Sequence, residues 1–358
     1  MAVRTRRKFL LDTVSAAAMI PVGGSRVLAG RVGATYRMPA EWAPHERTLM
    51  QFVPPQNWRR GDYRAAVREW AAVANAVADF EPVTMVVRPE DRKRAARLLN
   101  SEIEFVEMPL NDGWSRDTGP IFVIGDDGSR RVRGFTFNGW GGKFPPFDAD
   151  AEVKWRLAEA FAWPIDEIDF VLEGGAISVD GNGTLLTTEE CLLHPSRNPG
   201  MGKSDQERLL RDALGVDTVI WLGQGIAPDP VTDGHVDGLC VFAGPGAVLL
   251  QTTDDPADEN HVIGRDAKRR LQRARDAQGR RLEIIELPLA DDVLHINFYI
   301  CNGGVIVPIA GDPRQDDAPL SILRDVFPER RVVGVGGKVI AAGGGGVHCI
   351  TQQVPAAG

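Results

Sequence analysis

Cysteine, positive charge and long apolar runs are all scarce in this 358-residue sequence, and each shortage excludes a class of protein. The four cysteines stand singly, without the C-x-x-C spacing of zinc ribbons or thioredoxin-like centres, and no paired histidines indicate a metal site. No segment approaches the length needed to span a bilayer. No low-complexity linker interrupts residues 30–358 either, so this region is predicted to form one domain.

The deficit of positive charge bears on the partners of the protein. Lys and Arg number 41 against 49 Asp and Glu, which gives a net charge of −8. The first 29 residues are basic, with a net charge of +4, so the rest of the chain carries −12. Such an acidic chain argues against nucleic-acid binding and is compatible with a small cationic substrate. The sequence is also compatible with a homo-oligomer.

The basic first 29 residues have the organisation of an export signal. Arg6 and Arg7 precede a weakly apolar stretch, 10–22, and small residues suited to cleavage follow at 27–29. This pattern predicts a bacterial twin-arginine signal over 1–29 and a periplasmic or otherwise exported protein. The alternative is a basic N-terminus without a targeting role. An exported chain can pair four cysteines into two disulfides, but their scatter favours free thiols. The cysteines are Cys191, Cys240, Cys301 and Cys349.

A repeated unit organises residues 30–358. An acidic, amide or glycine position is followed by glycine and then by a strand-like run, at 117–124, 173–179, 233–242, 302–307 and 344–351. Segments with helical apolar spacing lie between these units, at 62–80, 152–162, 204–214 and 257–277. Asp62 is expected to cap the first helix, and Ser204 with Glu207 to form a capping box for the third. The pattern predicts an α/β fold with a cyclic five-part repeat.

His235 and Asp237 form the first candidate catalytic pair. If they lie in a strand, residues two apart point to the same face, and the imidazole and carboxylate project together. A histidine beside a carboxylate is a common way to build a proton carrier near neutral pH. The alternative for an isolated pair is a buried histidine satisfied by its neighbour. Its place at the glycine-flanked opening of a repeat favours the catalytic interpretation.

Cys349 lies in the strand-like run of the last unit, after four glycines that let a substrate or another backbone approach closely, Gly346 among them. A cysteine on an apolar strand is more often a small buried hydrophobe. A reactive thiolate needs a positive neighbour or a bound cation, and a guanidinium substrate would be that cation. In a regular strand His348 points to the opposite face, so no catalytic role is expected for it.

Candidate ligands for a planar cation are carboxylates and an aromatic ring. Asp117, Glu173 and Asp237 stand at equivalent places in three units, where they are able to surround the donors of a guanidinium. Trp114 is placed to stack over the cation, with ordinary core packing as the alternative. Asp112 is a further candidate for binding substrate, although a structural pair of Asp112 with Arg116 is an equal alternative.

Five stretches of the sequence match a known family. They are MPAEWAPHERT (38–48), NDGWSRDTGP (111–120), EGGAISVDGNGTLLTTEECLLHPSRNP (173–199), TDGHVDG (232–238) and GGGGVHCITQQVP (343–355). In these stretches the chain resembles the agmatine deiminase and bacterial peptidylarginine deiminase-like family of the guanidine-modifying superfamily. The resemblance implies a five-bladed αβ propeller (pentein) with its active site at the centre. It also implies catalysis without a metal or an organic cofactor.

The resemblance further implies a role for each candidate residue. Cys349 would be the nucleophile and His235 the general acid and base. Asp117 and Asp237 would bind the guanidinium, Glu173 would support His235 or the substrate, and Trp114 would shape the pocket. Gly113 and Ser115 replace bulkier residues usual in the family, which puts the substrate, but not the chemistry, in question.

The implied reaction is hydrolytic deimination, a hydrolysis of a linear C–N bond through a covalent thiouronium on the cysteine. Agmatine would give N-carbamoylputrescine, a precursor of putrescine in polyamine biosynthesis, and ammonia. Peptidylarginine and free arginine are alternative substrates. Two other classes stay open: a periplasmic binding protein for arginine-like cations, and a metal hydrolase built on His235, Asp237 and His348.

Overall fold

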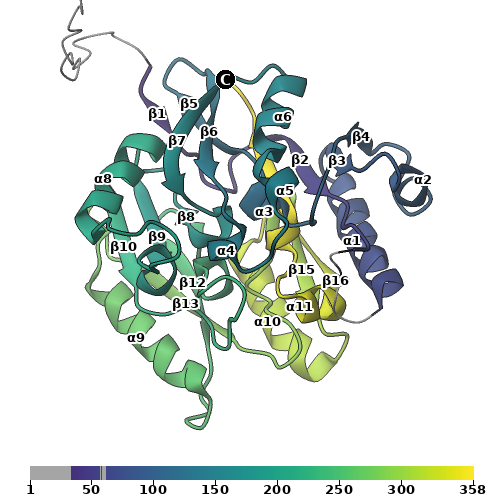
Figure 1. Ribbon diagram of the computed structural model, residues 1–358. Helices are drawn as coiled ribbons and strands as arrows, with labels where there is room; N and C mark the ends of the chain where they lie inside the picture. Colours follow the sequence, from purple (N-terminus) through teal and green to yellow (C-terminus); the bar gives the residue numbers. More distant parts are fainter. Residues whose placement is uncertain (1–33, 57, 59–61) are drawn as a thin grey trace, which may run out of the picture. The chain divides into compact units, whose positions relative to one another are not determined.

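Five small sheets, each built to the same plan, make up the part of the chain that the structure describes (Figure 1). This computed structural model describes residues 34–56, 58 and 62–358. The predicted export signal over residues 1–29 lies outside them. All five sheets belong to one unit, Ala34–Gly358. None of the helices among the described residues has both the length and the apolar character needed to cross a bilayer.

The plan is an antiparallel pair of strands followed by a crossover to a parallel third strand. The antiparallel pairs are β17–β2, β5–β6, β8–β9, β11–β12 and β14–β15. The parallel pairs are β2–β3, β6–β7, β9–β10, β12–β13 and β15–β16. A crossover between parallel strands needs a dozen or more residues and is usually helical, which is where the predicted helices fall. The α/β five-part repeat predicted from the sequence is confirmed.

The first two sheets each have four strands. The first consists of β17 (Thr351–Pro355), β2 (His45–Gln51), β3 (Val83–Val87) and β4 (Glu104–Glu107), with helices α1 (Tyr63–Ala78) and α2 (Arg92–Ala95). The second consists of β1 (Tyr36–Arg37), β5 (Ile121–Gly125), β6 (Arg130–Thr136) and β7 (Ile165–Val171), with helices α4 (Gly139–Gly142), α5 (Asp148–Ala151) and α6 (Val153–Ala160).

The other three sheets have three strands each. The third consists of β8 (Ser178–Val179), β9 (Thr184–Thr188) and β10 (Thr218–Leu222), with helices α7 (Glu189–Leu192) and α8 (Lys203–Leu214). The fourth consists of β11 (Cys240–Gly244), β12 (Ala247–Thr252) and β13 (Glu283–Pro288), with helix α9 (Glu259–Arg273). The fifth consists of β14 (Tyr299–Cys301), β15 (Gly304–Ile309) and β16 (Arg331–Gly336), with helix α10 (Pro313–Val326).

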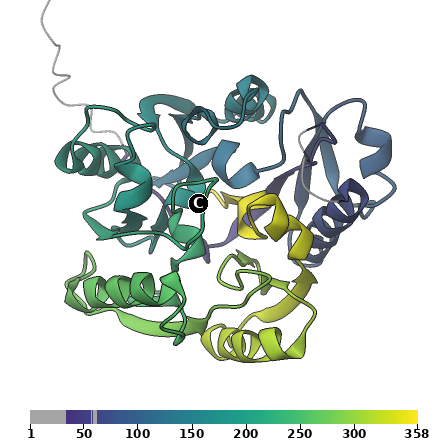
Figure 2. The ribbon, with the colours of Figure 1, turned by 60° about the horizontal axis from the view of Figure 1, so that its bottom comes forward.

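The sheets surround a common centre, and the long helices lie on the outside (Figure 2). Pairing of the C-terminal strand β17 with β2 joins the two ends of the described chain, with Thr351 opposite Met50 and Gln353 opposite Thr48. Because β17 opens the sheet that β2 continues, this repeat is assembled from both ends of the sequence.

Short helical turns precede the first strand of most repeats and point toward the centre. They are α3 (Ser115–Thr118), η1 (Gly174–Ala176), η2 (Val236–Gly238) and η3 (His348–Ile350), the last of which follows helix α11 (Lys338–Gly343). The opening expected at Asn302, in the unit that forms the fifth sheet, is wrong. Asn302 and Gly303 form the hairpin turn between β14 and β15, where Gly303 has φ 77°, and the true opening is the turn that ends at Asn297.

The N-cap expected for α1 is confirmed, whereas the capping box expected for α8 is not. The carboxylate of Asp62 accepts a hydrogen bond from the backbone of Arg64, as predicted for the N-cap of α1. The expected capping box of α8 is wrong, because Gly202 is the N-cap and no side chain caps that helix. Glu207 instead accepts from Trp221 Nε1 at 2.9 Å, which places it across the turn toward β10.

An indole cluster links the first sheet to the centre. Trp70 on α1 is fully buried, donates from Nε1 to the carbonyl of Gln51, and packs edge-on against both Trp58 and Trp114. The same apolar cluster includes Cys349. The core under α1 therefore extends directly to the candidate nucleophile.

Replacing Trp70 by Ala should remove this support. The loss of a fully buried indole is expected to lower the free energy of unfolding by about 3–5 kcal/mol. Urea denaturation measures the change. Val262→Ala on the exposed face of α9 is the matched control, and it should change stability by no more than about 0.5 kcal/mol. A Trp70→Ala protein as stable as this control would contradict the assignment of Trp70 to the core.

Candidate active site

The predicted site residues converge although their backbone is not the one expected. His235, Val236 and Asp237 do not lie in a strand, because 236–238 form the turn η2 and β11 begins only at Cys240. Cys349 likewise lies in η3 rather than in a strand. The argument from alternating strand faces was therefore wrong for both, and the turns bring the side chains inward by a different geometry.

Gly175 marks the point where three of these side chains meet. A Cβ atom at this position would lie 2.5 Å from His235 Nδ1, 3.0 Å from Asp237 Oδ2 and 3.1 Å from Asp117 Oδ1. Only glycine leaves room for them. The backbone N–H of Gly175 donates to Asp117 Oδ1 at 3.0 Å, so the glycine also fixes one of the carboxylates.

The second oxygen of Asp117 is held by an indole. Trp140 Nε1 donates to Asp117 Oδ2 at 2.9 Å. Trp140 has a left-handed backbone (φ 54°), rare for a residue with a side chain, which aims its ring at this carboxylate. Asp117 is 5% exposed and its Oδ1 lies 3.9 Å from His235 Nδ1. Both oxygens are thus fixed, and the charge faces the histidine.

Asp237 belongs to a buried chain of alternating charges that the sequence did not reveal. Its Oδ2 lies 2.8 Å from His348 Nδ1, and His348 Nε2 lies 2.8 Å from Glu41 Oε2. Arg116 Nη2 donates to the same oxygen of Glu41 at 3.3 Å. Carboxylates only accept, so both ring nitrogens of His348 carry protons. The expectation that His348 points away from the site is wrong, since η3 turns it toward Asp237.

The pKa values of this chain follow from its charges. Burial raises the pKa of Glu41, but the charges of His348 and Arg116 outweigh it and lower the value from 4.5 to about 2. Burial also opposes the charge of Asp237, and the hydrogen bond and charge of His348 leave its pKa below the usual value. Burial and Arg116 lower the pKa of His348, yet Glu41 and Asp237 raise it overall. The neighbours of each group in the chain therefore favour its charged form.

Glu173 forms a second buried ion pair. Its Oε1 accepts from Arg197 Nε at 2.7 Å, and Arg197 also donates to Asp233 Oδ2 at 2.7 Å. The other oxygen of Glu173, Oε2, has no hydrogen-bond partner among the described residues. Burial raises the pKa of Glu173 despite Arg197 and His235. Arg197 therefore orients the carboxyl group and leaves one oxygen for another ligand.

Cys349 lies against Asp237 and Asn297. Its Sγ is 3.4 Å from Asn297 Oδ1 and 3.7 Å from Asp237 Oδ2. Burial raises the pKa of the thiol well above its usual value, and the charges of Asp237 and Asp117 add to this. A cation placed among these groups would have the opposite effect. The site is suited to a thiol that ionises when a cation binds.

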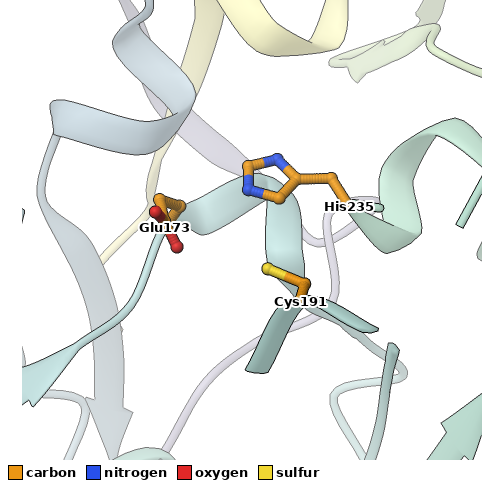
Figure 3. A group of neighbouring side chains, drawn as sticks. All are labelled: Glu173, Cys191 and His235. Carbon is orange, nitrogen blue, oxygen red and sulfur yellow. The ribbon is translucent and has the colours of Figure 1, made fainter. Parts of the chain in front are cut away.

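His235 has an unusual environment for a buried histidine. It is 4% exposed, and neither ring nitrogen has a hydrogen-bond partner among the described residues. Ligand atoms of Glu173, Cys191 and His235 lie within 4.8 Å of one another, and the three side chains face a common space (Figure 3). These are the described residues that are able to hold a metal ion.

A pocket opens beside the centre. It has a volume of about 190 Å³, and Trp114, Trp140, Asp112 and Asp150 are among its walls. Trp114 is thus both a core residue and a wall of the pocket, so its two interpretations are compatible. Burial raises the pKa of Asp150 to about 7. Gly346 does not line this pocket, and its missing Cβ makes room for Asn297.

Sequence reasoning missed several neighbours of the site for identifiable reasons. Asn297 was overlooked because the opening of the unit that forms the fifth sheet was placed at Asn302. Glu41 lies far from the other site residues in sequence, although it belongs to the stretch 38–48 that matched the family. Arg197 and Cys191 carry no periodic signal, and only the fold brings them to Glu173. All four cysteines are free thiols, as expected.

Removing the charge of Glu41 tests the buried chain. The depressed pKa of Glu41 stabilises the folded state above its unfolded pKa of 4.5, and this stability is lost as the pH falls through about 2. Glu41→Gln should therefore cost about 3 kcal/mol at pH 7, and the cost should shrink below pH of about 5. Urea denaturation at several pH values measures it, with exposed Glu167→Gln as the control. A cost independent of pH would contradict the charge chain.

Comparison with known proteins agrees with the resemblance found in the sequence. Residues 37–355 match the model of the Porphyromonas-type peptidyl-arginine deiminase family. An agmatine deiminase of Stutzerimonas stutzeri is 45% identical over 90% of this chain and 96% of its own, and one of Pseudomonas aeruginosa is 44% identical over the same shares. The solved agmatine deiminase of Enterococcus faecalis is 37% identical, with a TM-score of 0.86 over 91% of this chain and 99% of that one. The predicted five-bladed propeller is thereby confirmed, and the chain belongs to the Porphyromonas-type peptidyl-arginine deiminase family.

Proposed function

We propose that this protein hydrolyses agmatine to N-carbamoylputrescine and ammonia, with Cys349 as the nucleophile. The observation that carries the proposal is the charge around the thiol, where the carboxylates of Asp237 and Asp117 both oppose its ionisation. An arrangement of this kind suits a positively charged electrophile. Relatives named agmatine deiminase, which this chain matches over nearly their whole length, support the choice of substrate.

Binding of the guanidinium group would activate the nucleophile. A planar cation between Asp117 and Asp237 neutralises the charges that keep the thiol protonated, so the pKa of Cys349 falls on binding. Asp117 is suited to this role because Trp140 and Gly175 hold both of its oxygens in place. His348 holds one oxygen of Asp237, Oδ2, which also lies 3.7 Å from the thiol of Cys349.

The reaction then needs two additions and one proton carrier. The thiol of Cys349 loses its proton to His235 as the sulfur adds to the guanidinium carbon. His235 then gives this proton to the departing nitrogen, and the carbon–nitrogen bond breaks to release ammonia. The remaining thiouronium is attacked by water, from which His235 takes a proton, and the carbon–sulfur bond breaks to release the ureido product and the thiol. One oxygen of Glu173 has no hydrogen-bond partner in the part of the chain that the structure describes, and the charge of His235 acts on this carboxyl group, so Glu173 is placed to support the imidazolium.

The pocket beside the centre favours agmatine over free arginine. Asp112 and Asp150 contribute two carboxyl groups to its walls, and no lysine or arginine is among the described residues that line it. The ammonium group of agmatine suits these walls, whereas the α-carboxylate of arginine would meet like charge. Aromatic rings of Trp58, Trp114 and Phe147 provide apolar surface for the aliphatic part of the substrate.

Product formation from agmatine, arginine and an arginine-containing peptide tests the proposal. Agmatine should give a kcat/KM higher than that of arginine on the order of 100-fold, since a like-charge contact costs several kcal/mol. Cys349→Ala should lower the agmatine value by roughly 10⁴-fold or more. Cys240→Ala is the matched control, because Cys240 is a fully buried thiol whose pKa is raised by burial alone.

Each other outcome points to a different protein. Tight binding of agmatine without any product would indicate a binding protein. Preference for the peptide would indicate a peptidylarginine deiminase, and full activity of Cys349→Ala would refute the nucleophile.

We also propose that the protein is exported. The proposal rests on Arg6 and Arg7 before the apolar stretch 10–22. Replacing both arginines by lysine should shift the protein from the periplasmic to the cytoplasmic fraction of an expressing bacterium, since the twin pair is the feature that the export machinery reads. Arg26→Lys is the control. Equal distribution of the double variant and the control would refute the proposal.

A further inference from the structure

We propose that Glu173, Cys191 and His235 form a binding site for a thiophilic divalent cation such as Zn²⁺, and that the ion inhibits the enzyme by occupying His235. The inhibition rests on the proposed function, whereas ion binding does not. Cys191 has no part in the proposed reaction. It lies in α7, while Glu173 and His235 precede the turns η1 and η2.

The three ligands have the chemistry of a zinc site. Thiolate, imidazole and carboxylate are the usual ligands of Zn²⁺, at about 2.0–2.3 Å from the ion, which places ligand atoms roughly 3.3–3.7 Å apart in a tetrahedron. The ligand atoms of the three residues lie within 4.8 Å of one another. Movements of about 1 Å would bring them into range, and water would complete a tetrahedral ion.

The ligand atoms are buried and available. Both ring nitrogens of His235 and Oε2 of Glu173 have no hydrogen-bond partner among the described residues, although the two side chains are at least nine-tenths buried. A buried polar atom without a partner is costly, so a ligand that binds one nitrogen of His235 and Oε2 of Glu173 at once is favoured. Arg197 orients Glu173 through the other oxygen, Oε1, and leaves Oε2 directed to the shared space.

The charges around the cluster also suit a cation. Asp117 Oδ1 lies 3.9 Å from His235 Nδ1. Asp237 Oδ2 and His235 Nδ1 both lie next to the place that a Cβ atom of Gly175 would occupy. Arg197 opposes a cation, but its charge is shared between Glu173 and Asp233. The thiol of Cys191 must lose its proton to solvent when the ion binds. Because binding releases this proton, affinity should increase with pH.

Inhibition follows from the identity of the shared ligand. An imidazole bound to the ion is unable to carry a proton for the departing ammonia or for water. The ion also adds positive charge where a guanidinium would bind. Agmatine and the ion should therefore compete, and a chelator should restore activity.

The experiment uses the full chain and two readouts, one of them independent of activity. Co²⁺ replaces Zn²⁺ as a spectroscopic probe, because a cobalt–thiolate bond gives a charge-transfer absorption. Wild type should bind one Co²⁺ per chain with this absorption, and Zn²⁺ should inhibit it. Cys191→Ala should keep the activity, lose the absorption and weaken inhibition on the order of 100-fold, because the soft ligand is gone. Cys240→Ala, a buried thiol without metal-binding neighbours, should behave as wild type.

Cys349→Ala separates this site from one built on the nucleophile. It should be inactive and still bind one Co²⁺ with the thiolate absorption. Loss of the absorption in Cys349→Ala, or its persistence in Cys191→Ala, would overturn the proposal, as would a wild type that binds no Co²⁺. Circular dichroism checks that each variant is folded, and Cys191→Ser is a second variant of different polarity. If wild type binds Co²⁺ at Cys191 but forms no ureido product without metal, the proposed function fails and the metal site stands.

Discussion

The antiparallel pairing of β17 with β2 is the interaction on which the rest of this structure depends. It joins the last strand to the first long strand of the chain and completes a sheet that neither end is able to form alone. Cys349 lies in the turn directly before β17, so the pairing also fixes the position of the thiol relative to the other residues of the site. The indole cluster beneath α1 then packs this sheet against Cys349.

The resulting centre is a set of carboxylates, and each is held in place by a neighbouring cation or hydrogen-bond donor. His348 donates to Asp237 and Arg197 donates to Glu173. The indole of Trp140 and the backbone N–H of Gly175 donate to Asp117. Desolvated charges of one sign are costly, and these partners reduce the cost while they fix the direction of each oxygen. The fixed oxygens explain how a site so rich in negative charge remains stable and ready for a cation.

Among the residues that the structure describes, the same arrangement leaves both ring nitrogens of His235 without a hydrogen-bond partner. Both ring nitrogens are therefore available to a substrate, a water molecule or Glu173, as an imidazole that gives and then takes a proton requires. A free, buried imidazole beside a carboxylate and a thiol is also what a soft metal ion binds. Catalytic freedom and sensitivity to metal thus have the same structural cause.

Local sequence determined much of this protein. The alternation of glycine, strand and helix predicted the five repeats, and Asp117, Glu173, His235, Asp237 and Cys349 were identified because each stands within three residues of a glycine near the opening of a predicted unit. Glycine marks these places because only a residue without a side chain lets the polar groups approach one another, and that requirement is visible in one repeat at a time.

Only the tertiary structure decided what surrounds them. The turns η2 and η3 replaced the expected strands, which brought His348 to Asp237 rather than away from it. Glu41, Asn297, Arg197 and Cys191 reach the site from four other segments, at sequence distances for which no periodic pattern exists. Their contacts depend on closing the ring of sheets, so the charges and the pKa values they set are properties of the assembled centre and not of any single segment.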